Sequence, residues 1–347
     1  MTVHEPLRIG VLGAARISDL AIVQPAHELG ARLVSVAARD RSRAEAFASR
    51  HGFEKVLDNY QAVIDDPDVE VIYNPLANAL HGPWNLRAIE GGKHVLTEKP
   101  FSSNVEEARR VRDAAKAAGV HVVEAVHNEY HPMMARMIEL AGGGEIGDLE
   151  YVEVRMLMPP PAAGDVRWDV ALAGGALMDV GCYAVHAIRD MALSGRGEPR
   201  IVSVRAGALP QFPGVDAWMS ADMVLPNGVP AHFESSMTHG TVDSSLRLVG
   251  STGEAYAPNF AQVQLDDRII VTVATEQREE HLGRRLTYSH MLEAFARLIR
   301  EGIAMRTDAD DAVVNMQMID DLYRAAGMAP RRAVTVGLGL HPERDPV

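Results

Sequence analysis

Short apolar runs alternate with helical patterns along the first third of the chain. Five runs rich in valine, isoleucine, leucine and alanine have the length of buried strands, at residues 7–12, 31–38, 69–73, 94–97 and 120–126. Three segments between them carry apolar residues at helical spacing and are followed by a glycine, at residues 41–51, 80–90 and 105–118. This alternation predicts a parallel sheet with helices on both faces.

The pattern changes near residue 148. Residues 151–158 alternate between apolar and polar positions, and residues 174–194 indicate a glycine turn that leads into a helix. Five further runs suit an antiparallel sheet, at residues 201–209, 217–225, 231–237, 245–249 and 268–274. Helical patterns at residues 289–300 and 308–326 follow them. The order predicts a parallel α/β domain followed by an α+β domain.

The composition agrees with a folded protein of two domains. The chain has 347 residues, and a domain has ~150. Its 34 basic and 47 acidic residues give a net charge of −13, so binding to nucleic acid or to an anionic membrane is not expected. Cys182, the single cysteine, excludes an intrachain disulfide and a cysteine-rich metal site. Residues 1–6 show no secretion signal, and no apolar run approaches the ~18–20 residues of a membrane span, so a cytoplasmic protein is expected.

A glycine-containing turn follows the first predicted strand, where a dinucleotide-binding fold presents backbone N–H groups to a pyrophosphate. Gly13 is present, but Ala15 and Ser18 stand where the G-x-G-x-x-G pattern has its other glycines. An ordinary tight turn is the alternative. The position after the first strand favours a phosphate-binding loop, whose expected cofactor contacts are Gly13, Ala14, Ala15, Arg16 and Ile17.

The end of the second predicted strand bears on the choice of cofactor. NAD sites usually place an acidic residue there to bind the ribose 2′-hydroxyl, but this chain has Ala38 followed by Arg39. Arg39 can pair with a 2′-phosphate, and Arg43 is a second candidate, which favours NADP. The arginines could instead form a solvated helix cap. Asp40 could reach the ribose, so NAD also stays possible.

Two loops follow later strands of the parallel sheet, at the edge where such sheets bind ligands. The candidate cofactor contacts in these loops are Pro75, Leu76, Asn78, His81, Glu98 and Lys99. Lys99 is the most informative of them, because a lysine at this edge can point into the cleft. A solvated surface lysine is the alternative.

Several motifs together resemble those of the glucose–fructose oxidoreductase/inositol dehydrogenase/MocA (Gfo/Idh/MocA) family. They lie at residues 10–17, 78–81, 92–96, 98–100 (Glu-Lys-Pro), 124–132, 174–183 and 250–254. The resemblance covers nearly the whole chain. It implies a Rossmann NAD(P)-binding domain at residues 1–126 and a substrate-binding and oligomerisation domain at residues 127–347, with an open, mostly antiparallel sheet flanked by helices. It also implies hydride transfer between NAD(P) and a secondary alcohol or carbonyl of a sugar or cyclitol.

The candidate catalytic residues are Lys99, Asp179 and Tyr183. Asp179 and Tyr183 are four residues apart, so one helix face can present both to a substrate. The tyrosine resembles the branch of the family that contains NADP-linked xylose and dihydrodiol dehydrogenases, in which tyrosine is the expected acid/base. We expect the Lys99 charge to lower the pKa of Tyr183. The alternative is a helix start capped by Asp179, with Tyr183 packed in the core.

Other residues are candidates for the lining of the cleft. His127 is expected at the cofactor, and Tyr130, Arg167 and Trp168 are expected at the substrate together with Asp179 and Tyr183. A structural loop is an alternative for Arg167 and Trp168. His127 and His131 have the spacing of a metal pair, but the sequence shows no third ligand and the family needs no metal, so none is expected.

The sequence therefore favours an NADP-preferring dehydrogenase or reductase for a small sugar-like substrate. A redox-neutral sugar-modifying enzyme with a recycled cofactor and a non-catalytic NAD(P)-binding regulator are the alternatives. A homodimer or homotetramer is expected through the outer face of the second sheet. The reason is a group of apolar residues that could serve more than one face, namely Met219, Met223, Val224, Phe233 and Met237.

Overall fold

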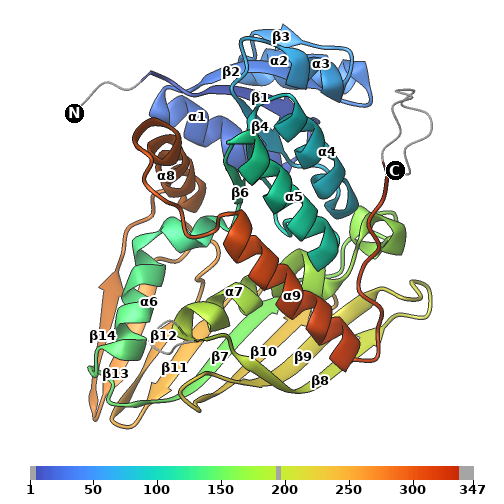
Figure 1. Ribbon diagram of the computed structural model, residues 1–347. Helices are drawn as coiled ribbons and strands as arrows, with labels where there is room; N and C mark the ends of the chain where they lie inside the picture. Colours follow the sequence, from blue (N-terminus) through green and yellow to red (C-terminus); the bar gives the residue numbers. More distant parts are fainter. Residues whose placement is uncertain (1–4, 193–196, 336–347) are drawn as a thin grey trace.

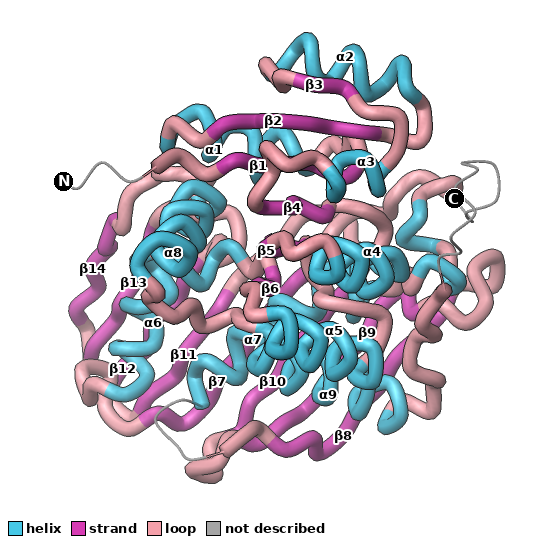
Figure 2. Tube along the Cα trace, turned by 45° about the horizontal axis from the view of Figure 1, so that its top comes forward, coloured by secondary structure: helices cyan, strands magenta, loops and turns pink. Residues whose placement is uncertain are grey.

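Two separate sheets organise the computed structural model, which describes residues 5–192 and 197–335 (Figures 1 and 2). The first sheet has the order β3-β2-β1-β4-β5-β6, and every neighbouring pair in it is parallel. Its strands are β1 Arg8–Leu12, β2 Arg32–Ala37, β3 Lys55–Val56, β4 Val71–Asn74, β5 His94–Thr97 and β6 Val122–Glu124. This order is the doubly wound arrangement that binds dinucleotides.

Helices connect these strands and begin and end at clear local signals. They are η1 Asp19–Val23, α1 Gln24–Leu29, α2 Arg41–His51, α3 Tyr60–Asp65, α4 Asn78–Glu90 and α5 Val105–Ala118. Side-chain oxygens of Asp40, Asn59 and Asn104 cap the N-termini of α2, α3 and α5. Gly52 and Gly119 end α2 and α5 in the left-handed conformation. The predicted parallel domain is confirmed; β3 and α3 were not predicted.

The second sheet has the order β14-β13-β12-β11-β7-β10-β9-β8. Its strands are β7 Leu149–Leu157, β8 Arg200–Ala208, β9 Asp216–Val224, β10 Pro230–Ser236, β11 Leu246–Gly250, β12 Gly253–Ala257, β13 Arg268–Val273 and β14 Glu276–His281. Neighbouring strands are antiparallel except β7 and β10, which are parallel. The mostly antiparallel sheet is therefore confirmed, although β12 and β14 were not predicted.

Helices of the second half cover one face of this sheet and return to the first domain. They are η2 His127–Tyr130, α6 Pro132–Gly142, η3 Val166–Trp168, η4 Val170–Leu172, η5 Leu177–Gly181, α7 Cys182–Met191, α8 Thr287–Glu301 and α9 Ala309–Ala325. α6, α7 and α9 pack on the sheet, whereas α8 packs on α1 and α9 also packs on α5. The last two helices therefore join the two domains. The helix predicted to end at residue 194 reaches outside the described residues, as do residues 1–4 of the N-terminus.

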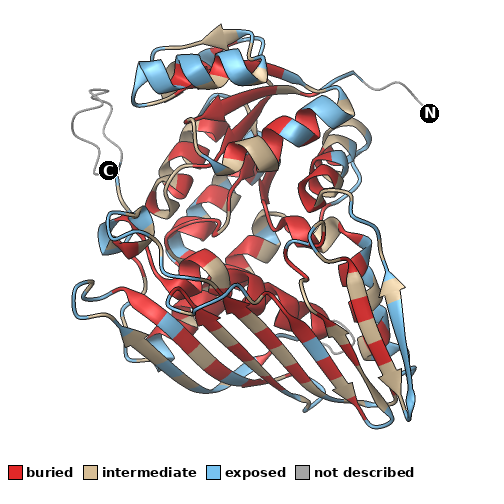
Figure 3. Cartoon of the chain, turned by 180° about the vertical axis from the view of Figure 1, so that it is seen from behind, coloured by how far each residue is buried: buried red, intermediate tan, exposed pale blue. Residues whose placement is uncertain are grey.

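Burial alternates along the strands of the second sheet (Figure 3). Met219, Met223, Phe233 and Met237 are all buried, at most 1% exposed, on the helix-covered side. The other face is mixed: it carries polar pairs such as Asp222 with His232 and also the exposed apolar side chains of Trp218 and Val202. Val224 follows Met223 directly and is only half-buried on the opposite face, so the expectation of apolar side chains on more than one face holds for Val224 and is wrong for the three methionines and Phe233.

The expectation that no apolar run approaches the length of a membrane span is wrong for one stretch. Val170–Met191 is long and apolar enough to cross a membrane by length and composition alone. Of the residues in its most apolar 18-residue segment, 89% are buried inside the protein. Here η4, η5 and α7 form part of the core. Burial of this kind is typical of a core helix.

Candidate active site

Lys99 lies in the loop after β5 and reaches across to the second domain. Its Nζ atom donates to the backbone oxygen of Asp179 at 2.5 Å and lies 3.5 Å from Asp179 Oδ1. The two side chains are only 15% and 11% exposed. Lys99 is therefore a buried cation paired with a buried carboxylate, not a solvated surface lysine.

The pair fixes the charge of both partners. Burial lowers the pKa of Lys99, but Asp179, with smaller contributions from Cys182 and Glu98, outweighs it, so the pKa of Lys99 is raised. Burial raises the pKa of Asp179, but the cations Lys99 and Arg167 outweigh it, so that pKa is lowered. Lys99 is therefore protonated and Asp179 ionised at neutral pH.

Arg167 holds the other oxygen of Asp179. Its Nε atom donates to Asp179 Oδ2 at 2.6 Å, and its Nη1 atom lies 3.1 and 3.2 Å from the two oxygens of Asp165. Asp165 also caps η3 by accepting from the Arg167 N–H group. Asp179 thus stands between two cations with one oxygen toward each, which leaves its carboxylate little freedom to rotate.

Tyr183 lies in the first turn of α7, beside Lys99. Lys99 Nζ is 5.2 Å from the centroid of the Tyr183 ring. The pKa of Tyr183 is raised well above its usual value, first by burial and then by the neighbouring phenol and acidic groups. The expectation that Lys99 lowers this pKa is wrong for the ligand-free protein, because burial dominates and Asp179 neutralises the lysine. Tyr183 therefore keeps its proton and is suited to donate it.

Tyr288, on α8, is a residue of this site that the sequence did not reveal. Its buried hydroxyl forms a hydrogen bond with Tyr183. His127 stacks on the Tyr288 ring at 3.8 Å and meets the Tyr183 ring edge-on at 5.5 Å. Its Nδ1 atom lies 2.8 Å from Thr287 Oγ1. Burial and Lys99 lower the pKa of His127 to about 3, so its ring is neutral. The three rings form an uncharged wall beside the lysine.

The glycine turn after β1 has the backbone that a phosphate-binding loop needs. Gly13 has a φ of +98°, and its N–H donates to Ala37 O at 2.7 Å. A Cβ atom at this position would lie 3.3 Å from Leu76 Cδ2 in the neighbouring loop. Glycine is therefore required for both the conformation and the close approach of the two loops.

The residues after β2 fit NADP better than NAD. Asp40 accepts from Ser42 N at 2.9 Å and caps α2, so its carboxylate is engaged. Arg43 Nη2 donates to Ala14 O at 3.1 Å, which places this arginine against the glycine turn. Arg39 is exposed and has no ion-pair partner within residues 5–192 and 197–335. Two arginines and no free carboxylate are what a 2′-phosphate requires.

The loop after β4 is held in place by two polar side chains. Both ring nitrogens of His81 contact backbone oxygens, Nδ1 with Pro100 at 2.7 Å and Nε2 with Leu76 at 2.9 Å. Asn78 Nδ2 donates to Ala173 O at 3.1 Å, next to the glycine turn that leads into η5. His81 therefore holds this loop against the loop of Lys99, and its ring nitrogens have no free position for a cofactor.

Two predicted substrate residues have their polar atoms engaged elsewhere. Trp168 stacks on Phe212 with centroids 4.7 Å apart, and its Nε1 atom donates to Pro161 O at 3.2 Å. Tyr130 Oη lies 2.7 Å from Thr307 Oγ1. Their rings support the walls of the site, and no described contact joins either of them to Lys99.

The histidine pair suggested by spacing has separate partners. His131 Nε2 lies 3.0 Å from Gly283 O, whereas His127 faces Thr287 and the two tyrosines. In the part of the chain that the structure describes, no group of three or more His, Cys, Asp or Glu side chains has the geometry to hold a metal ion.

Comparison with known proteins places the chain beside nicotinamide-dependent oxidoreductases. The model of an oxidoreductase family with an NAD-binding Rossmann fold matches residues 7–126, and the model of the GFO/IDH/MocA C-terminal domain matches residues 134–256. D-xylose 1-dehydrogenase (NADP(+)) 2 of Haloferax volcanii is 32% identical over 325 residues, which are 92% of this chain and 97% of that protein.

Two further matches extend this similarity. A dTDP-3,4-didehydro-2,6-dideoxy-alpha-D-glucose 3-reductase of Saccharopolyspora spinosa is 30% identical, over 90% of this chain and 92% of that protein. The crystal structure of KijD10, a 3-ketoreductase from Actinomadura kijaniata in complex with NADP and TDP-benzene, has a TM-score of 0.85 at 24% identity. It covers 92% of this chain and 98% of that one. At this identity the structural match supports the fold alone.

Proposed function

The chain belongs to the Gfo/Idh/MocA oxidoreductase family, and we propose that it transfers hydride between NADP(H) and a carbonyl or secondary alcohol carbon of a sugar or cyclitol. The observation that carries the proposal is the buried contact of Lys99 with Asp179 beside Tyr183. It joins a loop at the ligand-binding edge of the first sheet to a helix of the second domain. The division into a cofactor domain at residues 1–126 and a substrate domain at residues 127–347 belongs to the same proposal.

The glycine turn at Gly13 would hold the pyrophosphate of the cofactor, and Arg39 and Arg43 would hold its 2′-phosphate. The preference for NADP is supported by the engagement of Asp40 in the cap of α2. When bound, the nicotinamide supplies or accepts the hydride. The remaining steps belong to the chain's own side chains.

Lys99 and Tyr183 act on the substrate oxygen. In the reductive direction, negative charge develops on this oxygen, and the protonated Lys99 stabilises it. Tyr183 breaks its O–H bond and passes the proton to the same oxygen. In the oxidative direction Tyr183 must first lose its proton to solvent, and its phenolate then accepts the proton of the substrate hydroxyl. Asp179, fixed by Lys99 and Arg167, would orient a neighbouring hydroxyl of the substrate.

The substrate class follows from charge and from the relatives. Arg167, the arginine that contacts Asp179, is paired with both Asp165 and Asp179, so its charge is already balanced and does not call for an anionic group on the substrate. A neutral sugar such as a pentose, hexose or cyclitol fits this balance, in line with the xylose dehydrogenase relative. We also propose a cytoplasmic homodimer or homotetramer that assembles through the outer face of the second sheet.

A spectrophotometric screen tests this proposal. The purified protein is incubated with pentoses, hexoses or cyclitols and either NADP+ or NAD+, and the reduced cofactor is followed by its absorbance near 340 nm. Net formation of NADPH with at least one sugar, and slower formation of NADH, is expected. A redox-neutral enzyme would convert the sugar without net NADPH. No conversion of any sugar with either cofactor, in either direction, would contradict the proposal.

A further inference from the structure

Glu124 is a buried carboxylate at the end of β6, and its two oxygens contact two different parts of the site. Oε1 accepts from the backbone N–H of Phe101 at 2.8 Å, and Oε2 lies 3.3 Å from His186 Nε2. Phe101 follows Lys99 by two residues, and His186 follows Tyr183 by three. One side chain therefore connects the loop of Lys99 to the helix of Tyr183.

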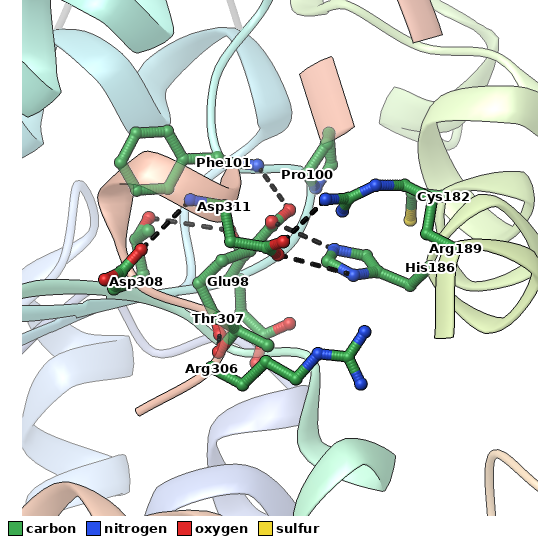
Figure 4. Close-up of polar contacts among 12 residues, drawn as sticks. Glu98, Pro100, Phe101, Cys182, His186, Arg189, Arg306, Thr307, Asp308 and Asp311 are labelled. Carbon is green, nitrogen blue, oxygen red and sulfur yellow. Dashed lines mark hydrogen bonds and ion pairs between the residues drawn. The ribbon is translucent and has the colours of Figure 1, made fainter. Parts of the chain in front are cut away.

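His186 is fixed from its other side as well. Its Nδ1 atom lies 3.8 Å from Asp311 Oδ2 near the start of α9. Asp311 is held in turn by Arg189 Nη2 at 2.6 Å and donates its own N–H to Asp308 Oδ1 at 3.0 Å. Figure 4 shows His186 with contacts on both sides of its ring and with Arg189 beside Asp311. The imidazole, which is only 2% exposed, has no room to turn away.

We propose that Glu124 and His186 are positioning residues that set the placement of Lys99 relative to Tyr183 across the two domains. Neither residue touches the reacting atoms in this account. The inference rests on the proposed function for the roles of Lys99 and Tyr183. The contacts themselves are independent of it.

The placement matters because the two reacting side chains come from different domains. Lys99 is carried by a loop of the first sheet, whereas Tyr183 is carried by α7 of the second domain, so local structure alone does not fix their separation. A displacement of about 1 Å can cost about 10²-fold in rate. Glu124 contacts both the loop of Lys99 and α7, and these two contacts keep the separation of Lys99 and Tyr183 constant.

A buried polar pair can also serve stability alone, and the two roles predict opposite effects of apolar replacement. If packing is the only role, His186→Leu, which keeps the volume, should be tolerated, and His186→Gln should bring no advantage. If His186 positions α7 through its bond to Glu124, His186→Gln should restore function, because its amide can donate to the carboxylate. His186→Leu should not.

The test compares kcat, KM and the melting temperature of these variants in the full-length protein. Glu124→Gln and His186→Leu should each lower kcat about 10- to 100-fold while changing the dissociation constant of NADP+ less than about threefold. His186→Gln should stay within about fivefold of wild type. The Glu124→Gln/His186→Gln double variant should lose no more than Glu124→Gln alone, because the residues act as one unit.

Glu107→Gln is the matched control. Glu107 is also fully buried and accepts from a backbone N–H of the same loop, that of Ser103 at 2.8 Å, but it lies on α5, and no hydrogen bond or ion pair among the described residues joins it to α7. This variant should lower the melting temperature and leave kcat within about twofold of wild type.

The outcomes separate the two proposals. A Glu124→Gln protein with wild-type kcat, or a fall in kcat equal to that of Glu107→Gln, overturns the positioning role while the proposed function stands. If the wild-type protein shows no NADP-linked turnover, the proposed function is contradicted instead. If His186→Leu does not fold, the comparison of Glu124→Gln with Glu107→Gln decides alone.

Discussion

Replacement of Asp179 by asparagine should convert a flat pH profile into a falling one. In the wild type Asp179 Oδ1 is 3.5 Å from the Lys99 ammonium. At an effective dielectric constant of about 20, this separation corresponds to about 5 kcal/mol of Coulomb attraction before any relaxation. The groups are largely buried, so water screens this attraction little. The asparagine removes the charge and leaves Lys99 beside the cation Arg167.

The sign of the effect follows from the causes that act on Lys99. In the wild type Asp179, together with Cys182 and Glu98, outweighs burial, so the pKa of Lys99 is raised and the lysine stays charged between about pH 6 and pH 9. In Asp179→Asn the largest cause that raises the pKa of Lys99 is removed, burial and Arg167 still lower this pKa, and the neighbouring Glu98 opposes them only in part. Because a neutral lysine cannot stabilise the developing oxyanion, kcat for carbonyl reduction should fall as the pH rises.

The assay is the steady-state oxidation of NADPH by a ketose or lactone substrate across that pH range. Wild-type kcat should be nearly constant, and Asp179→Asn should lose at least tenfold between the two ends. Asp165→Asn is the control, because Asp165 pairs with Arg167 but has no contact with Lys99 in the described structure. A pH profile of Asp179→Asn that is as flat as that of the wild type would refute the argument.

Three further predictions test other parts of the site. Arg39→Ala should weaken NADP+ selectively, and Ala38→Asp should shift the preference toward NAD+; calorimetry that finds equal wild-type affinities for the two cofactors would oppose this. Tyr183→Phe should lower kcat ~10²–10⁴-fold with NADP+ binding intact, and the double variant with Lys99→Met should lose much less than the product of the two single losses. Light scattering at micromolar concentration should give a dimer or tetramer, whereas a single species of 37.7 kDa would argue for a monomer.

The fold was predictable where the signals are local. The predicted strand at residues 94–97 and the predicted helix at residues 41–51 coincide with β5 and α2. A continuous apolar run indicates the strand, and capping residues at both ends indicate the helix, so both signals can be read from the local sequence. β14 could not be found in this way. Its residues are all polar and almost all exposed, and it exists through its pairing with β13.

The residues of the site also differ in whether the sequence could predict them. Lys99, Asp179 and Tyr183 could be singled out because their positions match motifs that resemble those of the family, whereas their position after a strand and their spacing of four residues alone left structural alternatives open; the structure brings the three together. Tyr288 could not, because it lies more than a hundred residues beyond Tyr183 and only the return of α8 to the first domain places it there. The direction of the Tyr183 pKa was mispredicted for a related reason. A sequence shows a nearby lysine but not the burial and the carboxylate that oppose it.

The most direct test of the central claim is the fate of a substrate hydrogen. Sugars that carry deuterium on carbon are incubated with NADP+ and the protein, and the cofactor is analysed by mass spectrometry. The account predicts one deuterium in each molecule of NADPH formed, and loss of this transfer in Tyr183→Phe together with Lys99→Met. Conversion of the sugar with no deuterium in the cofactor pool would contradict hydride transfer to NADP.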